Sequence, residues 1–442
     1  MVALLTVALP VGLLTGCRTT SGSAPGQSPG AGSPSPVSRS DTTASTPNTT
    51  SPSPGAHPSR TASPTATNLG RLLTGLVATA DQGNRSDFLA LVSDRDPGFT
   101  STAGMIFDNL RTISPDDLAF TATGKRRDVS TKRARILGAD AYAAQVQVTW
   151  SVPGDRVPSN QRIWMTIIRE HSELRWAGVV DGPSTPQPTP LWVLEPVHYA
   201  HRGAATVITG DGIDPGGWVT AANTAISHDV PRLRGADWNH QLVIIVPSNE
   251  HLVEQSLGVE QGADSALAGI SWPDGSDPKD APIRIMINKS GAASSLSTAI
   301  VLAHETVHVA TRSPTSPSPS WLVEGYADQI AYLAYPQAAQ LAAADVLSDV
   351  KRNGPPSRLP TEADFTAGSH DLNRTYAQAW LACHYLAATY GESKLWRFYA
   401  AVDASRDGAI AGPARTVFGI SSHQLVTGWQ HYLQTAAKRG RI

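Results

Sequence analysis

The sequence HETVH at His304–His308 is the stretch that decides the fold of this 442-residue chain. It lies in an apolar segment, residues 296–310, whose hydrophobic side chains recur at helical spacing. Ser294 or Ser295 is suited to cap the start of this segment. We therefore expect one helix that carries both histidines.

The two histidines have the spacing of metal ligands. Residues four apart in a helix lie on one face, so His304 and His308 can reach a single ion. Glu305 is turned by about 100° from His304 and can approach a metal-bound water without being a ligand. This pattern predicts a zinc site with Glu305 as the general base. A five-residue match is equally consistent with a helix that carries incidental histidines, so the flanking residues decide.

A third ligand is expected from the segment WLVEGYAD, Trp321–Asp328, which begins 13 residues after His308. The run between them is rich in Pro and Ser, which breaks the first helix and lets a second helix return. Catalytic zinc needs a third protein ligand and an open position, and Glu324 is placed to supply that ligand. Asp328 lies one turn further on, where it is predicted to accept the Nδ1–H of a ligand histidine, His304 rather than His308. The alternative for Asp328 is a solvated helix charge.

An alternating apolar segment, Ile283–Asn288, precedes the expected metal helix and predicts a β-strand. In zinc peptidases the strand before that helix often forms an open sheet edge. A peptide can add to such an edge as a further strand. We therefore expect Ile283–Asn288 at the edge of its sheet.

Together, His304–His308 and Trp321–Ala327 resemble the gluzincin metallopeptidases, and among them the bacterial peptidase MA-like family. The resemblance covers about residues 191–433. It extends to AGISW at Ala268–Trp272, YAQAWLACHYL at Tyr376–Leu386, FGIS at Phe418–Ser421 and Trp429.

This resemblance implies one Zn²⁺ per chain held by His304, His308 and Glu324, with Glu305 as the catalytic base. It implies a hydrolase acting on peptide or protein substrates. The sequence shows no obvious substrate-amine-binding signature of the exopeptidase type, which slightly favours an endopeptidase. Related enzymes stabilise the oxyanion with a Tyr or His from the C-terminal helical part. Tyr376 is the first candidate here, ahead of His370 and His384, and a packed core aromatic is the alternative reading of Tyr376.

The N-terminus predicts a lipid anchor. Residues 1–16 are almost wholly apolar, and LTGC at Leu14–Cys17 resembles a bacterial lipobox. We expect a signal peptide over residues 1–17 and lipidation of Cys17, which would attach the chain to the outer face of the cytoplasmic membrane. A secreted protein with an ordinary signal is the alternative. Residues 18–67 are nearly all Ser, Thr, Pro, Gly and Ala, a composition typical of a disordered tether.

Residues 68–185 predict a small α+β accessory domain. Apolar clusters around Gly83 and Asn84 indicate two short helices, and Tyr142–Trp150 alternates as a strand. Residues 163–168 and 174–179 indicate a hairpin. This order of helices followed by a curved sheet resembles the cone-like nuclear transport factor two-like fold.

The whole chain is thus expected to be α+β, with a tether, the accessory domain and a zincin-type peptidase domain over residues 186–442. Thirty-five basic against 37 acidic residues give a net charge of -2, which argues against nucleic acid as a partner. The second cysteine, Cys383, lies among apolar residues and is expected to fill the core without forming a disulfide. The protein is expected to be a monomer. The alternative function is a catalytically weak or inactive lipoprotein that binds peptide, cell-wall material or a protein partner.

Overall fold

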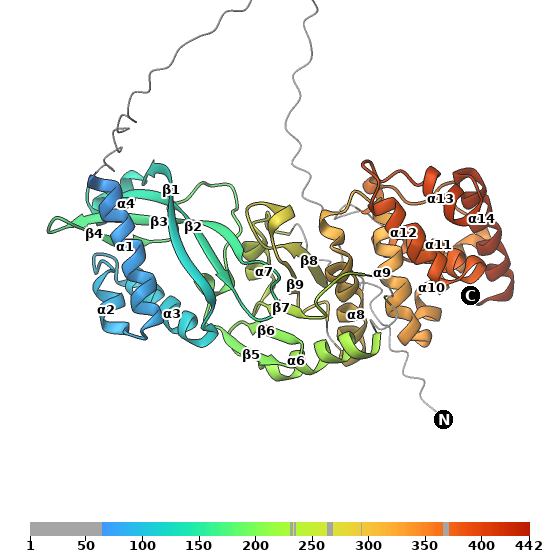
Figure 1. Cartoon of the computed structure of the whole chain (residues 1–442), viewed down its shortest axis with the longest axis horizontal. Helices are drawn as coiled ribbons and strands as arrows, with labels where there is room; N and C mark the ends of the chain where they lie inside the picture. Colours follow the sequence, from blue (N-terminus) through green and yellow to red (C-terminus); the bar gives the residue numbers. More distant parts are fainter. Residues whose placement is uncertain (1–63, 230–232, 234–235, 263–267, 293, 366–370) are drawn as a thin grey trace, which may run out of the picture.

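The protein is α+β, with two β-sheets and a helical C-terminal part (Figure 1). The computed structural model describes residues 64–229, 233, 236–262, 268–292, 294–365 and 371–442. The predicted signal peptide, Cys17 and most of the predicted tether lie outside the described residues. None of the described helices combines the length and apolar character that a bilayer span requires.

The middle region begins with three helices, α1 (Pro64–Asp81), α2 (Arg85–Ala90) and α3 (Pro97–Ile113). The two helices expected around Gly83 and Asn84 are confirmed as α1 and α2, and Asn84 caps α2 by accepting from the N–H of Asp87. Helix α1 starts at Pro64, so it includes residues 64–67 at the end of the predicted tether. Proline suits the first turn of a helix, where its missing N–H costs no hydrogen bond.

The first sheet follows these helices and has the strand order β1-β2-β3-β4, all antiparallel. The predicted strand and hairpin are confirmed as β2 and as the pair β3 and β4. His171 and Ser172 form the hairpin turn with positive φ values of 47° and 71°. The strands and the helix that joins the first two are β1 (Asp116–Asp128), α4 (Thr131–Leu137), β2 (Tyr142–Ser151), β3 (Ser159–Glu170) and β4 (Glu173–Gly178).

The second sheet is mixed, with the order β5-β6-β7-β9-β8. Strands β6, β7 and β9 are parallel, while β5 and β8 run antiparallel at the two edges. The elements of this part are α5 (Leu191–Leu194), β5 (His198–Arg202), β6 (Ala205–Thr209), α6 (Pro215–Thr224), η1 (Ala225–Asp229), β7 (Leu242–Val246), α7 (Glu250–Leu257), β8 (Gly269–Pro273), η3 (Pro278–Asp280) and β9 (Ile283–Ile287).

Strand β9 corrects one expectation. It is a strand, as predicted, but it does not form the sheet edge, because β8 pairs with it on its outer side. The chain reverses between Pro273 and Ile283, and this return places β8 at the edge. The outermost strand on the side of α8 is therefore β8, and four of its five residues are buried.

The C-terminal part is helical and joins the predicted metal helix, α8, mainly through helix α9 (Figure 1). Helix α9 returns against α8 and also packs closely on α11. The elements are α8 (Ser295–Thr311), η4 (Ser313–Thr315), α9 (Ser320–Ala334), α10 (Pro336–Asn353), η5 (Glu362–Phe365), α11 (Leu372–Tyr390), α12 (Glu392–Asp403), α13 (Ala411–Phe418) and α14 (Ser422–Arg439).

The central strands β6, β7 and β9 of the second sheet are buried on both faces, and the two faces belong to different cores. Side chains such as Ile244 and Ile285 face α8 and the C-terminal helices. The alternate residues, including Ile245 and Met286, pack with the helices and strands of the middle region. The period of two along each strand thus divides one sheet between two cores. The middle region is therefore packed directly on the sheet that supports α8.

A buried charge cluster joins the middle region to this sheet. Arg284 of β9 is fully buried and pairs with Asp155 at 2.6 Å and with Asp274 at 2.5 Å. Its guanidinium also lies 3.9 Å above the ring of Trp150. Ser159 and the side chain of Gln161, at the start of β3, donate to Asp274 at 2.6 Å each. The segment that follows β8 is thus held by residues of the middle region.

Candidate metal centre

Helix α8 carries the HETVH stretch through the centre of the protein. Ser294 caps it in a reciprocal arrangement with Ser297, which confirms one of the two expected caps. The helix ends at Arg312, which adopts the left-handed conformation with φ of 51°. His304, Glu305 and His308 have no solvent exposure. The local sequence therefore fixes where the helix begins and ends, and packing on both sides buries its polar residues.

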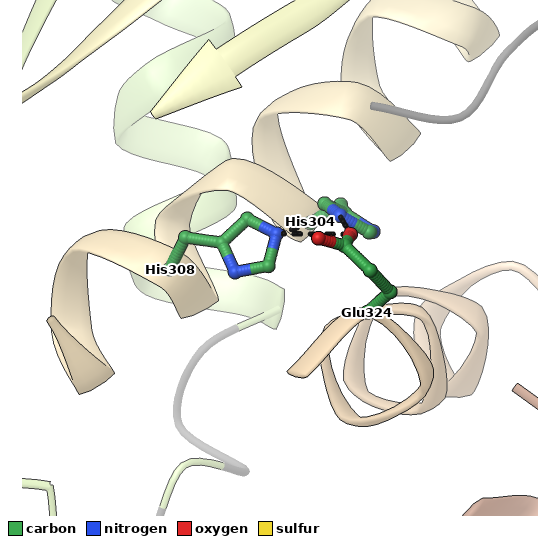
Figure 2. A group of neighbouring side chains, drawn as sticks. All are labelled: His304, His308 and Glu324. Atoms are coloured by element: carbon green, nitrogen blue, oxygen red, sulfur yellow. Dashed lines mark hydrogen bonds and ion pairs between the residues drawn. The ribbon is translucent and has the colours of Figure 1, made fainter. Parts of the chain in front are cut away.

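Three side chains from α8 and α9 converge on one point (Figure 2). Nε2 of His304 lies 2.8 Å from Nε2 of His308 and 3.2 Å from Oε2 of Glu324. Nε2 of His308 lies 3.4 Å from the same carboxylate oxygen. All three side chains are buried, with exposed fractions of 0–2%. The structure places His304, His308 and Glu324 together, as the sequence predicts.

Each histidine has a partner at its outer ring nitrogen. Oδ1 of Asp328, one turn beyond Glu324 on α9, lies 2.6 Å from Nδ1 of His304. The hydroxyl of Ser313, in the turn after α8, lies 2.7 Å from Nδ1 of His308. A carboxylate oxygen accepts, so His304 donates its Nδ1–H to Asp328, which leaves Nε2 as the nitrogen that faces Glu324. The predicted contact of Asp328 with His304 is therefore present.

Glu305 lies beside the cluster and contacts strand β8. The hydroxyl of Ser271 donates to Oε2 of Glu305 at 2.6 Å. Gly269 is so close that a Cβ atom there would lie 3.2 Å from Oε1 of Glu305. Oε1 is buried and has no hydrogen-bond partner in the part of the chain that the structure describes. One oxygen of this carboxylate is fixed, and the other remains free to accept a proton.

The close packing of charges shifts the pKa values of the site. Burial alone would lower the pKa of His304, but Asp328 and Glu324 raise it to about 10. Burial alone would raise the pKa of Glu324, but the imidazoles of His308 and His304 lower it to about 2. Burial raises the pKa of Glu305 and that of Asp328. Without a cation, the cluster is a protonated imidazole held between carboxylates.

The donor set fits a zinc ion. Two imidazole nitrogens and a carboxylate oxygen are typical zinc ligands. Ligand atoms bound at about 2.0–2.1 Å in a tetrahedral site lie about 3.3 Å apart. Both distances to Glu324, 3.2 Å and 3.4 Å, match this spacing, while the 2.8 Å between the imidazoles is the length of a hydrogen bond. The unpartnered Oε1 of Glu305 is a further sign that the site is built for a ligand.

The other candidates lie on α11 or outside the described residues. Tyr376 is buried in α11 with its ring edge-on to Phe365 at 5.3 Å, so its role as oxyanion stabiliser stays a prediction. His384 contacts Oε1 of Gln329 at 3.1 Å, and burial lowers its pKa. His370 lies outside the described residues. Cys383 is fully buried in α11, as expected of a core residue.

The sequence reading missed two residues of the site, Ser271 and Ser313. Ser271 lies 34 positions before Glu305 on a separate strand, and a single serine in a strand has no spacing signal. Ser313 directly follows the left-handed Arg312 at the end of α8. A hydroxyl residue five positions after His308 is the only sign of it in the sequence.

Comparison of the chain with protein-family models, with curated proteins and with solved structures finds no match. The assignment of a function therefore rests on the site itself.

Proposed function

We propose that the protein is a zinc-dependent peptidase. The observation that carries this proposal is the convergence of His304, His308 and Glu324 from two helices, with Glu305 beside them. A structural zinc site needs no such unliganded carboxylate, whereas a hydrolytic site needs a base next to the metal.

The chemistry divides among few residues. His304, His308 and Glu324 would hold the zinc, which when bound supplies a Lewis acid that polarises a carbonyl and acidifies water. Glu305 accepts a proton from the attacking water at its free Oε1. It then passes that proton to the nitrogen of the leaving amine as the peptide C–N bond breaks. Asp328 and Ser313 keep the two imidazoles oriented, and Tyr376 remains our candidate for stabilising the oxyanion.

The edge strand β8 supports a peptide as the substrate class. The backbone oxygen of Ala268 accepts from the N–H of Asn288, and the N–H of Asp274 donates to the backbone oxygen of Pro282. These two bonds flank the pairing of β8 with β9. In an antiparallel pair such residues alternate, so the backbone groups of Gly269 and Ser271 point to the outer edge. A peptide strand added there would run beside Glu305, and it would have to displace the atoms that bury Gly269 and Ser271. An endopeptidase stays the favoured class.

One observation favours a second function. The three candidate ligands are 0–2% exposed, a burial that also suits zinc as a structural element of a binding lipoprotein. Such a protein would hold peptide, cell-wall material or a protein partner without turnover.

Zinc content and peptide cleavage separate the two functions. Glu305→Gln should keep about one zinc per chain and lose cleavage of casein or a peptide library, because the variant retains the ligands and lacks the base. Glu260→Gln, the same change at an exposed site, is the control and should match wild type. Stoichiometric zinc without turnover in wild type would favour the binding function. Absence of zinc from wild type would refute the metal site.

We further propose that Cys17 anchors the protein to the outer face of a bacterial cytoplasmic membrane. The support is the lipobox-like Leu14–Cys17. Cys17→Ala should move the protein from the membrane fraction to the soluble fraction. Continued membrane attachment of that variant would contradict the anchor.

A further inference from the structure

Strand β8 contacts the base of the proposed reaction through Ser271. The serine hydroxyl lies 2.6 Å from Oε2 of Glu305 and 3.3 Å from the backbone oxygen of the same residue. A hydroxyl has one proton to donate, and the shorter contact to a carboxylate is the stronger bond. Both side chains are fully buried, so water does not compete for this bond.

Gly269 completes a slot for the same carboxylate. It lies two residues before Ser271, on the same face of β8. A Cβ atom at this position would lie 2.9 Å from Cγ1 of Val301 and 3.2 Å from Cγ of Glu305. The Glu305 side chain thus fills the space that a larger residue at 269 would take. Its orientation is restricted from two sides, by a hydrogen bond and by packing.

The strand that provides this slot is itself fixed. Asp274 directly follows β8 and pairs with buried Arg284 at 2.5 Å. Ser159 and Gln161 of β3 hold the same residue at 2.6 Å each. The position of Ser271 therefore depends on contacts with the middle region and not only on pairing with β9.

We infer that Ser271 is a positioning residue for Glu305. Its hydroxyl holds Oε2 and thereby leaves Oε1 as the oxygen that accepts the proton of water. This inference rests on the proposed peptidase function. It assigns the two carboxylate oxygens different roles and gives strand β8 a part in the reaction besides pairing with a peptide.

Ser271→Ala tests this role. Loss of a hydrogen bond to a charged group should lower kcat on a casein-derived peptide by about 10- to 100-fold. KM should stay unchanged, because the bond holds the base and not the substrate. Zinc content and the absorption spectrum of the cobalt-substituted protein should also stay unchanged, because Ser271 bonds to the base and not to His304, His308 or Glu324.

Ser256→Ala is the matched control. Ser256 is also buried, with 4% exposure, and its hydroxyl has no hydrogen-bond partner among the described residues. The two variants remove the same atom from equally buried positions, but only one touches Glu305. Gly269→Ala is a second variant, and it should lower kcat further because its methyl group enters the space of the carboxylate.

A binding measurement makes the test independent of turnover. Acetohydroxamate loses a proton when it binds a metal centre of this kind, so a correctly held base should favour it. Its affinity for the cobalt-substituted protein should fall in Ser271→Ala and Glu305→Gln and stay unchanged in Ser256→Ala.

Three results would overturn the inference. The first is an unchanged kcat and acetohydroxamate affinity in Ser271→Ala. The second is a loss of folded or metal-loaded protein in that variant with an unchanged kcat per zinc, which would indicate a structural role only. If zinc-loaded wild type neither cleaves peptides nor binds acetohydroxamate, the proposed function itself fails, and this inference fails with it.

Discussion

Oδ1 of Asp328 lies 2.6 Å from Nδ1 of His304, while Glu324, one turn earlier on α9, faces Nε2 of the same ring. One helix thus presents a carboxylate to each nitrogen of a single imidazole. Asp328 fixes the orientation of the ring, and Glu324 lies at Nε2, the nitrogen proposed to bind the metal. This arrangement makes α9 responsible for two separate properties of the site.

Asp328→Asn should weaken zinc binding. The amide keeps the shape of the side chain but lacks the charge that holds the Nδ1–H of His304. Replacing such a partner typically costs 10- to 100-fold in metal affinity, and we expect a loss in that range, measured by competition with a chelator. Asp345→Asn, in the exposed part of α10, is the control. Equal zinc affinity in the two variants would contradict a role for Asp328.

Zinc binding should release about one proton at pH 8. In the metal-free protein the pKa of His304 is raised to about 10, from an ordinary value of about 6.5. The proton on Nε2 must leave when a metal binds there. Calorimetry in buffers of different ionisation enthalpy measures this release, and a value near zero would show that the imidazole is already neutral.

The same shift predicts the pH dependence of stability without metal. A raised folded-state pKa stabilises the protein fully below about pH 6.5, and this contribution is lost as the pH rises through about 10. The metal-free protein should therefore lose stability as the pH rises from about 6.5 to about 10. Over the same range, the stability gained on adding zinc should increase. Urea titrations at several pH values, with zinc and with a chelator, measure both trends.

Gly325→Ala should disturb the site through packing. A Cβ atom at Gly325 would lie 2.3 Å from the backbone oxygen of Ala379, so α9 must move away from α11. Overpacking of this kind typically costs about 1–3 kcal/mol, and the shift would displace the neighbouring Glu324 and lower zinc affinity. Gly412→Ala in α13 has open space around it and should be neutral or slightly stabilising. The free energy of unfolding and the zinc affinity of both variants test this contrast.

Arg284→Met should destabilise the protein strongly. The change leaves Asp155 and Asp274 buried without their cation, and breaking a buried pair in this way costs about 3–5 kcal/mol. Arg85→Met removes an exposed partner of Asp108 and should cost no more than about 1 kcal/mol. Denaturant unfolding compares the two. Similar losses for both variants would show that the buried cluster adds no special stability.

The sequence predicted the parts of the site that depend on helix geometry. His304 and His308 are four residues apart in one helix, so their common face follows from the helical repeat. Glu324 and Asp328 repeat this spacing on the next helix, and the Pro/Ser-rich break indicated that the chain turns back. In each case the two residues are four apart within one helix, so the helical repeat alone places them on the same face.

The remaining contacts depend on pairings that local patterns do not encode. Ser271 reaches Glu305 only because β8 pairs with the outer side of β9, and nothing in Gly269–Pro273 specifies its partner strand. Arg284 looks like the polar residue of an alternating strand that faces solvent. It is buried because the middle region covers that face and supplies Asp155 and Trp150. Sheet order and packing between regions therefore had to come from the structure.

The division of the second sheet between two cores has a consequence for the inheritance of this protein. Recombination that replaced residues 64–185 with an unrelated segment would expose Ile245 and Met286 and leave Arg284 without Asp155. Such a chimaera would lose the support of β9, the strand that leads into the metal helix. Descendants of this gene should therefore retain both halves together, with sequence changes on one side of the shared surface matched by changes on the other.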